Sequence, residues 1–106
     1  MAYALKSTNP ITFNISASKE TTRTITVSIS APPSPGMVTI TLQNFTFAYS
    51  DGKQYGFGQM GIELGTVVSG STWTATCVAT LSDDKRDERK WQGTVVGLVS
   101  YYEEFK

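Results

Sequence analysis

Histidine is absent from this 106-residue sequence, and cysteine occurs once. Without histidine the chain can form neither a Ser-His-Asp nor a Cys-His catalytic arrangement, and it lacks a common zinc ligand. The single cysteine, Cys77, excludes a disulfide within the chain. It shares a predicted strand face with Ala75 and Ala79, so we expect a buried, unreactive thiol. We therefore expect a protein that is not an enzyme and that holds no metal or other cofactor.

An excess of charge of either sign is also lacking, because nine basic residues balance nine acidic ones. A neutral chain lacks the basic surface that nucleic acids require, so we expect no nucleic-acid partner. No apolar run approaches the roughly 20 residues needed to span a bilayer, and residues 1–6 do not form a signal peptide. We expect no membrane insertion and synthesis in the cytoplasm. The final location stays open, because export without a cleaved signal is compatible with this sequence.

Serine, threonine and β-branched residues are abundant, and they alternate in the way that strands require. Apolar and polar residues alternate strictly over 11–18 and again over 24–30, which predicts two strands in a hairpin or in successive positions of a sandwich. Residues 37–49 form a longer apolar pattern whose parity changes halfway. A bulge near Gln43 and Asn44 would restore a single apolar face, because one extra residue resets the alternation.

The remaining segments complete an all-β pattern. Asp51 and Gly52 predict a tight turn, and glycines alternate with aromatic residues over 55–61, which permits a bend or close approach of two backbones. We expect a further strand over 72–81 and a charged loop over 82–92. Residues 93–102 are apolar on both faces, which predicts a central strand that is covered on both sides. Prolines at 32–35 predict a long turn within one fold. We predict a single domain over 1–106, an antiparallel β-sandwich of six to seven strands.

Aromatic and charged residues outside the predicted core are the candidates for ligand binding. Amphipathic rings beside carboxylates and guanidinium groups suit carbohydrate, which needs a flat apolar platform and directional hydrogen bonds, and they also mark protein interfaces. The predicted ligand-binding residues are Tyr55, Phe57, Asp84, Arg86, Arg89 and Trp91. A simpler interpretation makes the loop a solvated surface of weak ion pairs. Another assigns its acids to calcium, although the spacing of a calcium loop is absent and Lys and Arg would oppose a cation.

The strand Gly93-Thr94-Val95-Val96-Gly97-Leu98-Val99-Ser100-Tyr101 is loosely similar to the closing strand of H-type lectins. That family consists of small six-stranded sandwiches that assemble into trimers and hexamers. The similarity covers this strand alone, and none of the family's sugar-contacting positions maps onto this chain, so it assigns the chain to no family. It is compatible with a carbohydrate-binding function.

Two functions follow from these observations. The first is a ligand-binding module without catalytic activity, with carbohydrate as the favoured ligand. The alternative is a structural or self-assembling component of a particle, fibre or surface layer. Both allow a homo-oligomer, which the aromatic residues Tyr101, Tyr102 and Phe105 near the end of the final strand favour. A secreted effector or inhibitor stays open as a third interpretation.

Overall fold

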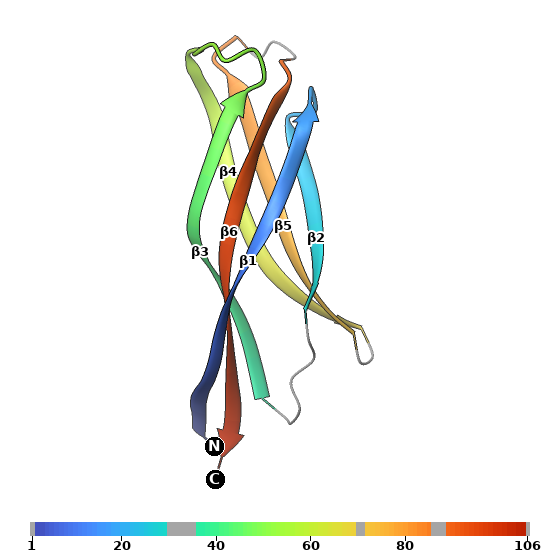
Figure 1. The fold of residues 1–106 in the computed structure, drawn as a ribbon, viewed down its shortest axis with the longest axis vertical. Coiled ribbons are helices and arrows are strands. Elements are labelled where there is room, and N and C mark those ends of the chain that lie inside the picture. Colours follow the sequence, from blue (N-terminus) through green and yellow to red (C-terminus); the bar gives the residue numbers. More distant parts are fainter. Residues whose placement is uncertain (1, 30–35, 70–71, 86–88, 106) are drawn as a thin grey trace.

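The computed structural model describes residues 2–29, 36–69, 72–85 and 89–105. These residues form six antiparallel strands in two packed sheets, which confirms the predicted all-β sandwich. The strands are β1 (Ala2–Ser18), β2 (Thr22–Ile29), β3 (Gly36–Tyr49), β4 (Phe57–Ser69), β5 (Thr72–Asp83) and β6 (Trp91–Phe105). One sheet has the order β1-β6-β3 and the other β2-β5-β4 (Figure 1). The predicted proline-rich turn at 32–35 lies outside the described residues.

The two strands with strict alternation, β1 and β2, lie in different sheets. They are successive strands of a sandwich and do not form a hairpin with each other. β6 lies between β1 and β3, which confirms its predicted central position. The expectation that β6 would be covered on both faces is wrong for the chain alone, because only one face of its sheet packs against β2-β5-β4 and the other faces outward.

The predicted bulge in β3 is present. The register of β3 against β6 shifts between Leu42 and Asn44, so Leu42 pairs with Gly97 and Phe45 pairs with Val95. Both β6 residues belong to the inner face, and paired residues of an antiparallel sheet point to the same side. The bulge therefore keeps both apolar sets of β3 on the face that looks toward the second sheet.

The core occupies the half of the sandwich that is remote from the termini. Seven apolar residues are buried there: Phe13, Ile15, Ala75, Cys77, Ala79, Trp91 and Val95. Cys77 has no exposed surface, and this burial raises the pKa of its thiol, as expected of an unreactive cysteine. Toward the termini the two sheets diverge, and β1, β3 and β6 run on without β4 and β5 beside them (Figure 1). The molecule is elongated, with extents of 54 × 22 × 18 Å.

Candidate ligand-binding site

Two loops meet at the end of the sandwich opposite the termini. Residues 50–56 connect β3 to β4, and residues 84–90 connect β5 to β6 (Figure 1). Their backbones are joined at two points, since Ser50 donates to the carbonyl of Lys90 at 2.9 Å and Asp84 donates to the carbonyl of Gly56 at 2.9 Å. Segments that lie far apart in sequence therefore form one surface.

The predicted Asp-Gly turn shapes the first loop. Gly52 has a φ of 74°, a conformation that glycine adopts without steric cost. The Asp51 carboxylate accepts a hydrogen bond from the backbone amide of Lys53 at 2.9 Å, and it also accepts one from the hydroxyl of Tyr55. These bonds lower the pKa of Asp51, with the Tyr55 hydroxyl as the larger cause, and the bond to Asp51 raises the pKa of Tyr55. The turn thus fixes the position of the Tyr55 ring.

Asp83 is a buried acid at the end of β5, with 2% of its surface exposed. A buried carboxylate needs a partner, and the Nε of Arg89 lies 2.6 Å from its Oδ2. The guanidinium of Arg89 also lies over the ring of Tyr55, 3.7 Å from the centroid, in a cation–π contact. The rings of Tyr49 and Tyr55 also form an edge-to-face pair, with their centroids 4.9 Å apart. Arg89 therefore connects the buried end of β5 to the first loop.

The glycine-rich stretch forms a bulge where β4 begins. The register of β4 against β5 shifts between Phe57 and Gln59, and a Cβ atom on Gly58 would lie 2.0 Å from the carbonyl oxygen of Asp83. Only glycine allows this close approach of two backbones. Beyond the bulge the Phe57 side chain is 74% exposed, the highest value among the exposed large hydrophobic residues described.

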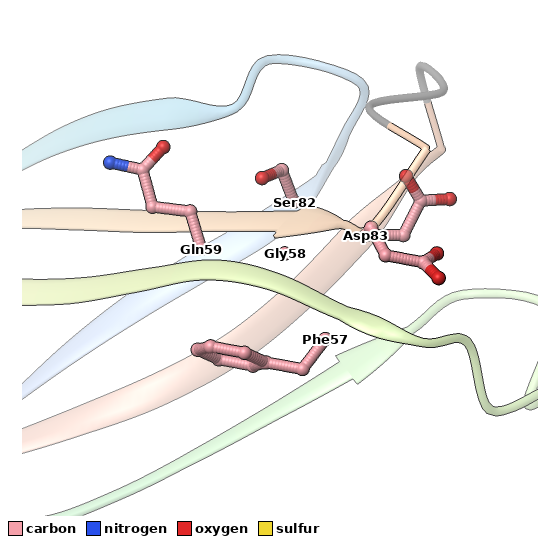
Figure 2. A pocket seen from close by; sticks show the side chains of 6 residues that line it. Phe57, Gly58, Gln59, Ser82 and Asp83 are labelled. Carbon is pink, nitrogen blue, oxygen red and sulfur yellow. The ribbon is translucent and has the colours of Figure 1, made fainter.

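A pocket of about 450 Å³ surrounds this bulge, within the range of about 300 to 1,000 Å³ that small-molecule sites occupy. Its lining consists of Phe57, Gly58, Gln59, Ser82, Asp83 and Asp84. Figure 2 shows Gln59 and Ser82 on one side of β4 and the Phe57 ring on the other, so the pocket wraps around the beginning of this strand. The site offers one exposed aromatic ring together with amide, hydroxyl and carboxylate groups.

The predicted ligand-binding residues fall into four groups. Phe57 and Asp84 line the pocket, whereas Tyr55 and Arg89 contact each other beside it. Arg86 lies outside the described residues. Trp91 is only 1% exposed, and its indole N–H donates to the carbonyl of Glu20 at 2.7 Å. The expectation that Trp91 presents an exposed platform is therefore wrong: it is the first residue of β6 and part of the core.

Three of the residues that line the pocket, Asp83, Gln59 and Ser82, are not among the ligand-binding residues predicted from the sequence. A signal existed for Asp83, because it continues the alternation of the buried residues Ala75, Cys77 and Ala79 and should therefore point inward. The sequence around Gln59 and Ser82 contains no such signal. The Gly58 bulge determines to which side of the sheet Gln59 points, and this bulge forms only where β4 pairs with β5. Within the described ranges no group of three or more His, Cys, Asp or Glu residues could hold a metal ion.

Comparisons with protein families, with curated proteins and with solved structures found no match to this chain. No helix long and apolar enough to cross a membrane occurs in the part of the chain that the structure describes.

Proposed function

We propose that this protein is a binding module without catalytic activity, and that its ligand is a carbohydrate that occupies the pocket around the Gly58 bulge. The observation that carries the proposal is the position of Phe57, an exposed ring on the rim of a pocket otherwise lined by polar groups. The absence of histidine from the whole sequence supports a role other than catalysis.

The chemistry of the pocket matches that of a sugar, which has apolar C–H faces and a ring of hydroxyl groups. The Phe57 ring can cover a C–H face, and the exposed Asp84 carboxylate can accept hydrogen bonds from hydroxyl groups. Gln59 and Ser82, which lie on the other side of β4 from the Phe57 ring (Figure 2), can both donate and accept such bonds with a ligand that reaches around the start of this strand. Hydrogen bonds to a charged acceptor are stronger than those between neutral groups. Among the polar groups of the pocket, Asp84 should therefore contribute the most to the affinity.

Tyr55 and Arg89 act in this proposal as positioning residues. Arg89 joins Asp83 to the Tyr55 ring, and the amide of Asp84 is bonded to Gly56, next to Tyr55 in the chain. These contacts hold the two loops together and thereby fix the carboxylate of Asp84 against Gly56, which precedes Phe57 in the chain. Preorganisation of this kind improves affinity because less freedom is lost on binding.

A glycan array covering neutral and acidic sugars tests the proposal. We expect saturable binding to at least one glycan class, lost on Phe57→Ala and weakened on Asp84→Asn. Phe105→Ala is the matched control, because Phe105 is also exposed, at 50%, but lies at the far end of β6. An array that stays blank across all classes, or binding that Phe57→Ala leaves unchanged, would contradict the proposal.

Self-assembly is the second function that an observation favours. The radius of gyration is 16.6 Å, compared with about 13 Å expected for a compact domain of this length. The elongated sandwich leaves large apolar strand residues exposed, Leu5 and Met37 among them. Packing against copies of itself would cover them, and an oligomer would also present several ligand pockets together.

A further inference from the structure

We infer that a second copy of this chain packs on the outer face of the β1-β6-β3 sheet, over the half that contains the termini. This inference rests on self-assembly, the second function proposed above, and does not depend on ligand binding. The contact would centre on an apolar cluster at the end of the sheet, which we call the terminal band: Tyr3, Leu5, Met37 and Tyr102.

A bulge in β1 creates the terminal band. Ile11, Phe13 and Ile15 of β1 face the core, and Leu5 has the same odd parity, so an undisturbed strand would turn it inward as well. The register of β1 against β6 shifts between Leu5 and Ser7, however, and Leu5 pairs with Tyr102 instead of Glu103. Because even-numbered residues of β6 lie on the outer face at this point, Leu5 faces outward.

The band runs across all three strands of the sheet. Leu5 of β1, Tyr102 of β6 and Met37 of β3 occupy one row, since both edge residues pair with Tyr102. Tyr3 lies one row nearer the end, opposite Glu104. Leu5 is 55% exposed, Tyr3 44% and Met37 40%, so the chain itself leaves much of this apolar surface open to solvent. A contiguous exposed apolar patch of this kind is typical of an interaction site.

The outer face next to the terminal band contains no charged residue over four successive rows of the sheet. Those rows are Thr8-Ser100-Thr39, Pro10-Leu98-Thr41, Thr12-Val96-Asn44 and Asn14-Thr94-Thr46. Interface cores are depleted of charged residues, because a buried charge without a partner is costly. These four rows can be covered by an identical face without burial of a charge, while Glu104 lies beside Tyr3 at the end of the sheet. The zero net charge of the chain adds no repulsion between copies.

The exposed area of the single chain points to a partner of matching size. Its accessible surface is 6753 Å². A compact monomer of 11.5 kDa is expected to expose about 5,800 Å², which leaves an excess of roughly 950 Å². A standard protein interface buries about 800 Å² on each partner. One interface with a second copy would therefore bring the exposed surface to the value of a compact protein.

The oligomeric state of the full 106-residue chain tests this inference, measured by native mass spectrometry and sedimentation velocity from 1 to 100 µM. We expect the unmodified chain to be an oligomer and the double variant Leu5→Lys/Met37→Lys to be a monomer. Any oligomer of the double variant should dissociate at a concentration at least tenfold higher than that of the unmodified chain. The matched control is Val67→Lys, which places a charge on an exposed apolar residue of the other sheet. It should leave the oligomer intact.

Hydroxyl-radical labelling of the unmodified chain gives a second measurement that does not depend on a variant folding. Met37 and Met60 have similar exposure, 40% and 43%, but belong to different sheets. As concentration rises through the assembly range, we expect protection of Met37 and not of Met60. An unmodified chain that is monomeric at 100 µM would contradict self-assembly itself. An oligomer that protects Met60 alone, or that dissociates only on Val67→Lys, would overturn the assigned surface and leave self-assembly standing.

Discussion

The Nε atom of Arg89 lies 2.6 Å from the Oδ2 atom of Asp83, an acid whose side chain is 1% exposed. The pair joins the end of β5 to the start of β6, and the guanidinium continues outward onto the ring of Tyr55. The charged loop, which as a sequence resembles an ordinary solvated surface, is therefore anchored by one buried carboxylate.

Removal of Arg89 should destabilise the fold through this carboxylate. We expect Arg89→Met to lower the free energy of unfolding by about 2–3 kcal/mol, somewhat less than the loss for a wholly buried pair, because the arginine side chain is partly exposed. Urea denaturation at pH 7 measures the change. Glu20→Gln is the control, since it breaks a longer ion pair, at 3.8 Å, between Arg23 and the exposed Glu20, and should cost less than about 0.5 kcal/mol. Equal losses in both variants would show that Asp83 does not need its partner.

The Asp51 carboxylate should titrate below its ordinary range, because the Tyr55 hydroxyl and the Lys53 amide favour its charged form. A lowered pKa in the folded state stabilises the turn above about pH 4, the ordinary aspartate value, and this stabilisation is lost as pH falls through the lowered pKa. Carbon-detected NMR titration should show the pKa of Asp51 rising toward its ordinary value in Tyr55→Phe. Tyr101→Phe should leave it unchanged, and an unshifted Asp51 in the unmodified chain would refute the bond.

Trp91 and Phe57 should respond to truncation in opposite ways. Trp91 is buried, packs edge-on against Phe47 at 5.2 Å and bonds the Glu20 carbonyl. We expect Trp91→Ala to lower the free energy of unfolding by about 3–5 kcal/mol. Phe57→Ala should lower the free energy of unfolding by less than about 0.5 kcal/mol, because this ring is exposed, but it should abolish ligand binding. Thermal and urea denaturation compare the two, and a strongly destabilised Phe57→Ala would mean that this ring belongs to the fold.

Gly58 should not tolerate a side chain. A Cβ atom there would lie 2.0 Å from the carbonyl oxygen of Asp83, so the backbones of β4 and β5 would have to separate. We expect Gly58→Ala to destabilise the fold by about 1–3 kcal/mol. Gly61→Ala is the matched control on the same strand, because the nearest atom to its Cβ would be 3.9 Å away, and it should be neutral within about 0.5 kcal/mol. Similar unfolding curves for both variants would contradict the bulge geometry.

The sequence alone determined the class of the fold and several of its local features. Strict alternation over 11–18 and 24–30 predicted strands, the parity change near Asn44 predicted the β3 bulge, and Asp51-Gly52 predicted the turn, and all are present. These features are local: they depend on the two-residue period of a strand and on the backbone conformations that the turn residues prefer. The predicted loop residues Tyr55 and Arg89 contact each other, and Phe57 and Asp84 line one pocket.

The tertiary structure alone decided what depends on pairing between distant strands. Trp91 stands at the edge of a charged segment in the sequence, and it is buried only in the assembled sandwich, where it pairs with Tyr49 and packs against Phe47. Leu5 has the parity of a core residue, and only the bulge against Tyr102 turns it toward solvent. Local alternation specifies that a strand has two faces, but the register with its partner strand specifies which face is buried. Whether Leu5 and Trp91 belong to the core or to the surface was therefore fixed only in the assembled sandwich.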